Sequence, residues 1–553
     1  MNKFIRQNNV QLFRRNFQTK SVPFIHNSLS GALQELQVKP PYVTWYACGP
    51  TVYDDAHLGH ARTYVCFDII RRILTSHYKI PLLYAMGVTD IDDKIINKAK
   101  EENVLSSQIA KKFEKRFFED MFSLGVLEPH VRLRVSEHMT HIIKYIEEII
   151  NQGHAYSTPS GVYFDVKNFG DKNYGSFKHP SSEDDDDGIL LNSDKRDRRD
   201  FALWKCSSNA EDLNNSGTSG SNSDSSWESP WGVGRPGWHI ECSALTHSHF
   251  GSKLNIHSGG RDLAFPHHCN EIAQCESHAG SPGKGWGDLW IHTGHLYIKG
   301  RKMSKSLKNF ISIKELLNDR GVHKDDIRLF CLQYHYRSDI HFSEDRMSEA
   351  QSLRSNILKF LERAQTLGTC TGPWDIEDRN LFERVMKAQQ DVDVSLSNDF
   401  DTPNILRILS SLITTSDIYM KNKEVSGMIP KQPLEAVSQL VISTFQMLGV
   451  DSITSLSHRV TNNSDSELVS NRALEELVLF RSQVRDLAKT SLKKDKSTPQ
   501  GEKAVVPLGV QVLKLCDQLR DDTLPTIGVY VEDRVSGSFT SSVAPTKKPP
   551  KSK

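Results

Sequence analysis

The chain has 553 residues, of which 37% are hydrophobic and 25% charged, and its formal net charge is +1. This length suggests about three or four domains, and this composition is typical of a globular protein with an apolar core. No run of about 18 apolar residues occurs, which excludes a membrane-spanning helix and a membrane partner. The near-neutral balance gives no overall attraction to nucleic acid, so RNA binding would need local basic clusters.

The N-terminal segment differs in composition from the rest. It contains no Asp or Glu before Glu35, and it mixes apolar residues with Lys3, Arg6, Arg14 and Arg15. An amphipathic, arginine-rich and acid-poor start is typical of a mitochondrial transit peptide. We therefore predict a transit segment over 1–35, removal near Phe17, and a mitochondrial matrix location. The alternative is an unstructured basic terminus.

The first predicted elements alternate between strand and helix. Residues 42–48 form an aromatic and β-branched run that predicts a buried strand, and a helix follows from Leu58. Residues 82–89 predict the next strand. Strand, helix and strand at this spacing indicate an α/β fold that opens a parallel sheet. The nine cysteines are scattered and form no CxxC pair, which indicates a reducing compartment.

The middle and the end of the chain have other patterns. Two polar segments, 181–200 and 207–226, are predicted to be flexible loops on the surface. Helical periodicity then predicts helices at 346–366, 377–397, 404–420, 433–448, 467–490 and 506–522. The segment 536–553, with its Lys- and Pro-rich end, is expected to be a disordered tail.

Two short motifs indicate nucleotide chemistry. His57 and His60 fall in the first turn of a predicted helix, whose free N–H groups and dipole suit phosphate, and Gly59 allows close approach. Lys302 and Lys305 lie in Lys-Met-Ser-Lys-Ser, where their charge suits a pyrophosphate leaving group. Either motif alone is better explained as ordinary structure or surface. Together, in this order, they resemble the HIGH and KMSKS signatures of class I aminoacyl-tRNA synthetases.

Four further residues suggest a metal site. Cys48 ends the first strand, Cys242 lies in Gly-Trp-His-Ile-Glu-Cys, and His267 and Glu271 are four positions apart, which places them on one side of a helix. Two cysteines, a histidine and a glutamate are a plausible tetrahedral zinc set. Buried cysteines beside an unrelated histidine are the alternative. Cys269 is rotated by about 200° from His267 on a helix, so we expect it to point away from the metal.

Over residues 42–345 these motifs, with Thr89-Asp-Ile-Asp-Asp-Lys94 and Asp262-Leu-Ala-Phe-Pro-His-His268, resemble the cysteinyl-tRNA synthetase family, and the N-terminal segment resembles its mitochondrial type. The resemblance implies a Rossmann-like catalytic domain with a connective insertion at 36–345, a tRNA-binding helical bundle at 346–451, and an anticodon-contacting module at 452–535. It implies zinc ligands at Cys48, Cys242, His267 and Glu271, and contacts to the substrate cysteine from Gly49, Thr89, Trp238 and His267. The residues implied to bind ATP are Thr51, His57, Gly59, His60, Lys302 and Lys305, among which the two histidines and two lysines are catalytic.

The implied reaction joins L-cysteine to tRNA(Cys) through a cysteinyl-adenylate, with ATP accompanied by Mg²⁺. Lys94-Ile-Ile-Asn97 matches part of a lysine-rich motif of relatives that are credited with a pyridoxal-phosphate-dependent cysteine persulfide activity, so this second activity is a weaker expectation. Two alternatives stay open: a cysteine ligase acting on a small amine, and a catalytically silent tRNA- or zinc-binding protein.

Overall fold

The computed structural model describes residues 22–38, 41–177, 194–207, 225–298, 300–302, 310–366, 373–426 and 429–453, and then 484, 508–518, 529–533 and 539–543. The chain divides into two compact units, Met1–Thr454 and Ser455–Lys553. Each unit is described by itself. Within the described ranges no helix is both long and apolar enough to cross a membrane.

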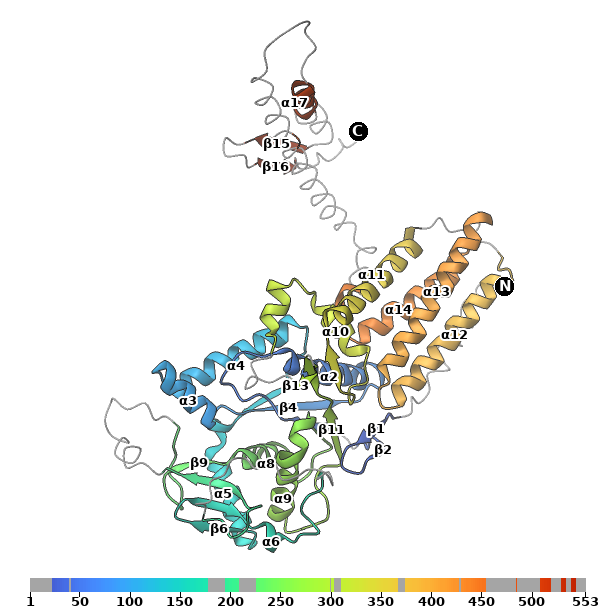
Figure 1. Cartoon of the computed structure of the whole chain (residues 1–553). Coiled ribbons are helices and arrows are strands. Elements are labelled where there is room, and N and C mark those ends of the chain that lie inside the picture. The colour runs from blue at the N-terminus through green and yellow to red at the C-terminus, as the bar shows by residue number, and fades with distance from the viewer. Residues whose placement is uncertain are drawn as a thin grey trace, which may run out of the picture. The chain divides into compact units, whose positions relative to one another are not determined.

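A five-stranded parallel sheet forms the centre of the first unit (Figure 1). Its strand order is β11 (Leu289–Thr293), β10 (Ile256–Gly260), β3 (Val43–Ala47), β4 (Leu82–Val88) and β5 (Val131–Arg134). Helix α2 (Leu58–Arg72) connects β3 to β4. The strand, helix and strand predicted from the sequence are thus confirmed, as is the α/β class.

Both faces of this sheet are covered. Alternate side chains of β3 point to opposite faces, so this strand packs against both layers. Trp45 packs edge-on against Phe67 of α2, with ring centroids 5.9 Å apart. Tyr46 faces the other way, into a core with residues of α5 (Met139–Asn151), α8 (Trp238–Phe250) and α9 (Cys269–His278). Burial on both sides explains why the strand is nearly continuous in apolar residues.

An antiparallel sheet is inserted between α5 and α8. It is ordered β6 (Ala155–Thr158), β7 (Gly161–Phe164), β8 (Phe201–Cys206) and β9 (Gly234–Pro236), with the short α6 (Val166–Phe169). The predicted loop 181–200 extends too far, because residues 194–200 belong to the fold. Asp200 is buried and accepts a hydrogen bond from the Tyr156 hydroxyl at 2.6 Å. Residues 178–193 and 208–224 lie outside the described residues.

Further elements flank the sheets. Helices α3 (Asp93–Glu102) and α4 (Ser106–Ser123) follow β4, and α10 (Lys324–Leu332) contacts α2. A small sheet has the order β13 (Arg301–Lys302), β12 (Leu296–Ile298) and β14 (Ile340–Phe342). At the N-terminal side, β1 (Phe24–Asn27) pairs antiparallel with β2 (Ala32–Glu35).

This N-terminal hairpin corrects the predicted transit segment. The side chain of Asn27 is 3% exposed, and its Oδ1 accepts a hydrogen bond from the backbone N–H of Trp290 in the central sheet at 3.1 Å. Residues 24–35 are therefore part of the fold, and the boundary at residue 35 is wrong. The basic, acid-free composition covers the shorter segment before Phe24, and β1 has too few residues to be recognised by pattern.

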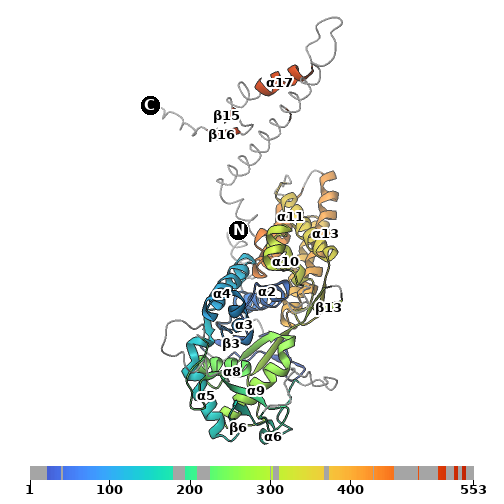
Figure 2. The same cartoon turned by 60° about the vertical axis from the view of Figure 1, so that its left-hand side comes forward.

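The four predicted long helices form a bundle, in which Figure 1 labels all four next to one another and Figure 2 shows α11 and α13 from another side. They are α11 (Glu344–Thr366), α12 (Ile376–Ser397), α13 (Thr402–Ser426) and α14 (Lys431–Met447). Each begins and ends within a few residues of its predicted range except α13, which continues beyond residue 420.

The second unit is described only in part. It contains α17 (Leu508–Gln518) and a hairpin of β15 (Val529–Asp533) with β16 (Phe539–Val543). Strand β16 lies in the segment 536–553, so the expectation of a disordered tail is wrong for these five residues. They pair with β15 in a local hairpin, whereas the prediction rested on the Lys- and Pro-rich composition of the end of the chain. The predicted helix 467–490 lies outside the described residues except for residue 484.

Candidate metal and nucleotide site

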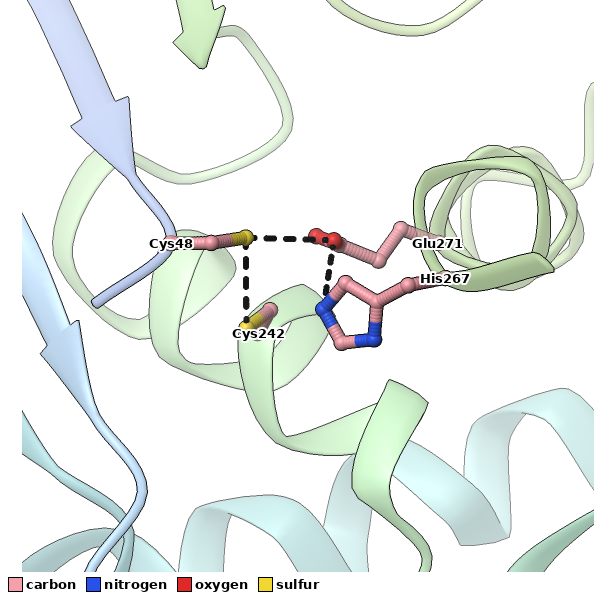
Figure 3. Close-up of side chains that lie close together, drawn as sticks. All are labelled: Cys48, Cys242, His267 and Glu271. Atoms are coloured by element: carbon pink, nitrogen blue, oxygen red, sulfur yellow. Dashed lines mark hydrogen bonds and ion pairs between the residues drawn. The ribbon is translucent and has the colours of Figure 1, made fainter. Parts of the chain in front are cut away.

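Four buried side chains from three parts of the chain converge beside the carboxyl end of β3 (Figure 3). Cys48 directly follows β3, Cys242 lies in α8, His267 lies in the turn before α9, and Glu271 lies in the first turn of α9. None is more than 5% exposed. The sequence prediction named these four residues, and the fold brings their donor atoms within 4.8 Å of one another.

The distances fit a tetrahedral zinc ion. Zinc bonds of about 2.3 Å to sulfur and about 2.0 Å to nitrogen or oxygen imply ligand separations of about 3.8 Å for S–S, about 3.6 Å for S–O and about 3.3 Å for N–O. The Sγ atoms of Cys48 and Cys242 are 3.7 Å apart, and Cys48 Sγ lies 3.6 Å from Glu271 Oε1. His267 Nε2 lies 3.1 Å from the same oxygen.

The charges of the site also suit a cation. A hydrogen bond from Cys48 lowers the pKa of the Cys242 thiol to about 6. Burial raises the pKa of Glu271, but His257 and His267 outweigh this effect and lower it to about 2. A thiolate and a carboxylate in a dry pocket are the anionic donors that a divalent metal ion requires.

Histidines that sequence reasoning did not identify surround this cluster. His257 Nε2 lies 3.0 Å from Glu271 Oε2, and His239 Nδ1 lies 2.9 Å from His267 Nδ1. These contacts leave Glu271 Oε1 and His267 Nε2 directed at the cysteines, which is how outer partners orient metal ligands. His268 Nε2 lies 3.4 Å from Cys48 Sγ, so Cys48, His257, His268 and Glu271 form a second, overlapping set of donors. Cys269 belongs to neither set.

The residues expected to contact the substrate cysteine lie around this cluster. The ring of Trp238 is 39% exposed and lies 4.3 Å from that of His267 between centroids. Thr89 follows β4, and its hydroxyl donates to buried Glu241 at 3.2 Å. A Cβ on Gly49 would lie 1.7 Å from the carbonyl oxygen of Gly87, so a glycine is required there by the backbone itself. Glu241 is a further buried acid that the sequence prediction missed.

The two histidines of the first motif cap helix α2. His57 is the N-cap, and its Nδ1 accepts from the His60 backbone N–H at 3.3 Å, while His60 Nδ1 accepts from the His57 N–H at 3.3 Å. Their rings stack with centroids 3.8 Å apart. Gly59 lies between them in the first turn. Thr51 pairs with Thr89 in an isolated parallel bridge, which brings the ends of β3 and β4 together.

The start of α2 contacts residues that follow the second signature, although about 240 residues separate the two signatures along the chain. The Leu58 N–H donates to the carbonyl of Ile311 at 2.9 Å, and the Ile313 N–H donates to that of Ala56 at 3.2 Å. These contacts place residues 310–313, which come after the second motif in the sequence, at the start of α2; residues 303–309 lie outside the described residues. The backbone of Lys302 pairs with Tyr297 in β13 and β12. Lys305 lies outside the described residues.

Comparison with known proteins agrees with this architecture. Residues 34–352 match the family model of the tRNA synthetases class I (C) catalytic domain. The fold is similar to methionyl-tRNA synthetase of Mycobacterium tuberculosis bound by methionyl-adenylate, with a TM-score of 0.58 at 12% identity over 77% of this chain and 95% of that one. It is also similar to a leucyl-tRNA synthetase of Agrobacterium radiobacter, with a TM-score of 0.53 at 12% identity over 75% and 85%. These likenesses show a class I synthetase fold.

Relatives with higher sequence identity show which family of class I synthetases includes this chain. A probable mitochondrial cysteine–tRNA ligase of Xenopus tropicalis is 38% identical over 92% of this chain and 88% of its own length. A probable mitochondrial cysteine–tRNA ligase of Dictyostelium discoideum is 36% identical over 94% and 85%. A cysteine–tRNA ligase of Thermococcus gammatolerans is 40% identical over 72% and 81%. The chain therefore belongs to the cysteine–tRNA ligases, a family of class I aminoacyl-tRNA synthetases.

Proposed function

We propose that this enzyme activates L-cysteine with ATP to form enzyme-bound cysteinyl-adenylate and then transfers the cysteinyl group to the terminal ribose of tRNA(Cys). The observation that carries the proposal is the Cys48, Cys242, His267 and Glu271 cluster beside the histidine-capped start of α2. By class I analogy the first acceptor is the 2′-hydroxyl. Cysteine-dependent exchange of pyrophosphate into ATP tests the first step, and charging of mitochondrial tRNA with cysteine against other amino acids tests the second.

Zinc is the metal that the donor set fits, with Cys48, Cys242, His267 and Glu271 as its ligands. When bound, zinc supplies a soft Lewis acid that favours the substrate sulfur as thiolate. Serine offers a harder and far less acidic oxygen, so cysteine can be selected without a separate editing step. The half-exposed Trp238 beside His267 and the backbone around Gly49 and Thr89 would hold the rest of the amino acid.

The nucleotide end would use the two signatures together. The start of α2, with His57, Gly59 and His60, offers a positive dipole end to the phosphates of ATP, and Thr51 lies at the adjacent strand end. Lys302 and Lys305 would stabilise the negative charge that develops on the leaving pyrophosphate. Magnesium would accompany the ATP phosphates.

We assign the RNA-binding half by the same resemblance. The catalytic domain would span 36–345 with the hairpin of residues 24–35 packed on it, the bundle at 346–451 would bind tRNA, and the module at 452–535 would contact the anticodon. Enzyme assays distinguish this function from two alternatives. A cysteine ligase for a small amine would turn over without tRNA, and a silent tRNA- or zinc-binding protein would show no cysteine-dependent pyrophosphate exchange.

We further propose that the protein acts in the mitochondrial matrix, in support of mitochondrial translation. The names of two relatives and the basic, acid-free start of the chain support this location. Because β1 belongs to the fold, the reporter fusion that tests import should carry residues 1–23. A cytosolic, uncleaved reporter would overturn the proposal.

The pyridoxal phosphate expectation finds little support in the surroundings of Lys94. This exposed residue begins α3 next to Asp92 and Asp93, and its Nζ lies 5.5 Å from the centre of the Tyr53 ring. The neighbouring cations Lys205 and Arg235 are paired with Asp93. These residues fit a phosphate-bearing cofactor poorly. The persulfide activity stays a prediction, which pyridoxal phosphate binding and Lys94→Ala would test.

A further inference from the structure

Arg62 of α2 is buried in an unusual way. It is 1% exposed, and its Nη2 donates to the carbonyl oxygens of His335 at 2.9 Å, Tyr336 at 3.2 Å and Ser338 at 3.4 Å. Its Nη1 contacts the thiol of Cys66 one turn further along the helix. Among the residues that the structure describes, no carboxylate forms an ion pair with this guanidinium. A buried cation without an anionic partner is costly, and an apolar side chain could fill the same space at lower cost.

The segment that Arg62 holds, residues 335–339, is also held by the helical bundle. Asp399 lies in the turn between α12 and α13 and is 3% exposed. Its Oδ1 accepts from the Tyr336 hydroxyl at 2.6 Å, and its Oδ2 accepts from Arg337 Nε at 2.6 Å. The same carboxylate accepts from the backbone N–H of His26 in β1 at 2.9 Å. One buried carboxylate therefore joins the bundle to the catalytic half.

A third set of contacts leads to the strand that carries the second signature. The Gly294 N–H donates to the Tyr336 carbonyl at 3.0 Å, and the His295 N–H donates to Asp339 Oδ1 at 2.8 Å. These two residues directly precede β12, which pairs with β13 and Lys302. Residues 335–339 thus contact three parts of the fold: the α12–α13 turn, helix α2, and the residues directly before β12.

We propose that Arg62 and Asp399 are positioning residues that couple tRNA bound by the bundle to the catalytic centre, through the segment 335–339. The proposal rests on the proposed function. A shift of the α12–α13 turn moves the hydrogen-bonded segment, and this segment is bonded both to α2 and to the start of β12. Because pyrophosphate exchange is measured without tRNA, whereas bound tRNA engages this coupling, loss of the coupling should lower tRNA charging more than exchange.

The decisive variant is Asp399→Asn. Asp399 has a φ of 54°, a left-handed conformation that asparagine tolerates well. The change keeps size and backbone but places an amide against Arg337. We expect cysteine-dependent pyrophosphate exchange within about twofold of wild type, while kcat/KM for tRNA charging falls by about tenfold, as expected when a contact is used only in the tRNA-dependent step.

Asp378→Asn is the matched control. Asp378 is 1% exposed and also accepts from a tyrosine hydroxyl and a cation, Tyr419 at 2.8 Å and Lys423 at 2.8 Å. Its partners lie inside the bundle, so the variant should lower Tm without changing the ratio of charging to exchange. Two results would overturn the proposal. One is the same ratio of charging to exchange in Asp378→Asn as in Asp399→Asn, and the other is a ratio in Asp399→Asn equal to that of wild type.

A second variant keeps the test independent of the folding of Asp399→Asn. Arg62→Lys retains the charge, but its shorter side chain ends in one nitrogen in place of two and cannot reproduce the contacts of Nη1 and Nη2 together, so it should also reduce charging more than exchange. The double variant should lose less than the sum of the two single losses, because both act through residues 335–339. Strictly additive losses would contradict the shared route. A wild-type protein without exchange would instead refute the proposed function itself.

Discussion

The Sγ atoms of Cys48 and Cys242 lie 3.7 Å apart although 194 positions separate the two residues in the sequence. Cys48 is fixed by the end of β3, and Cys242 by the second turn of α8. The Cys48 N–H also donates to the carbonyl of Ser258 in the neighbouring strand β10 at 3.0 Å. The two thiols are therefore brought together by regular elements of the fold, as a selective metal site requires.

The first prediction concerns zinc content. Cys242→Ser should lose most of the one zinc ion expected per chain, because serine stays protonated near neutral pH and is a poor zinc ligand. Cysteine affinity should fall with the metal, together with discrimination against serine. Cys269→Ser is the control and should keep its zinc. Elemental analysis of both proteins decides, and loss of zinc from the control would mean that the ligand set is misassigned.

The second prediction separates the two overlapping donor sets. If His257 only orients Glu271, His257→Gln should weaken zinc binding by about 10- to 100-fold, the usual effect of losing an outer partner. At saturating zinc this variant should still bind one ion per chain. His267→Gln removes a proposed ligand and should bind less than one zinc ion per chain even at saturating zinc. Chelator competition measures both affinities. The reverse order of effects would favour the set that contains His257 and His268.

The third prediction tests the lysine motif. Lys305→Ala should slow cysteine-dependent pyrophosphate exchange by on the order of 100-fold, the typical loss of about 3 kcal/mol for one transition-state contact. Cysteine binding should change little, since the charge is needed mainly in the transition state. An exchange rate equal to that of wild type would show that the motif has another role.

The fourth prediction concerns pH and a histidine outside the site. Burial, aided by the neighbouring His247, lowers the pKa of His278 to about 4 from its ordinary 6.5. The unfolded chain therefore takes up a proton at a higher pH than the folded protein. The contribution of His278 to stability is complete above pH 6.5 and is lost as the pH falls towards about 4.

His278→Phe keeps a ring to stack on Tyr145, whose ring centroid lies 3.9 Å away, and removes the titrating group. Between neutral pH and pH about 4.5, the Tm of the variant should fall less than that of wild type. Over this range only the unfolded wild-type chain gains a proton at His278. Thermal denaturation at several pH values measures the difference. Parallel slopes for wild type and His278→Phe would contradict the assignment.

Much of the fold was predictable because its signals are local. The buried strand at 42–48 and the helix from Leu58 follow from periodicity within one element, and the bundle helices do so as well. The four proposed zinc ligands came from recognisable motifs, and the fold brings their donor atoms close together. Lys302 and Lys305 were predicted in the same way; the structure describes only the backbone of Lys302, and their role stays a prediction.

The residues that were missed depend on tertiary contacts. His257 is a single residue inside the buried strand β10, where nothing in the local sequence shows that it faces the cluster. His268 precedes α9 in a turn where Phe265 has non-helical angles, so helical spacing gives no guide to its direction. Arg62 would be read as a solvated residue on a helix, since its partners lie about 270 positions further along the chain.

The last prediction separates cysteine activation from RNA recognition. A chain ending at Thr454 should keep cysteine-dependent pyrophosphate exchange and lose most of its tRNA charging, because the anticodon contacts are assigned to the part that follows. The position of the cut matters. Ile453 is fully buried, and the Ser452 N–H donates to Asp325 Oδ2 at 2.6 Å, so an end before residue 452 would expose the core and remove a contact to α10.

A chain ending at Asp451 is therefore the informative control for this truncation. It should have a lower Tm than the chain ending at Thr454 and reduced exchange, because it loses the buried Ile453, a residue type worth about 2–5 kcal/mol when truncated. The chain ending at Thr454 should have the Tm of the first unit with exchange intact. Equal loss of exchange and charging in that longer chain would show that the second unit serves the catalytic half instead of RNA recognition.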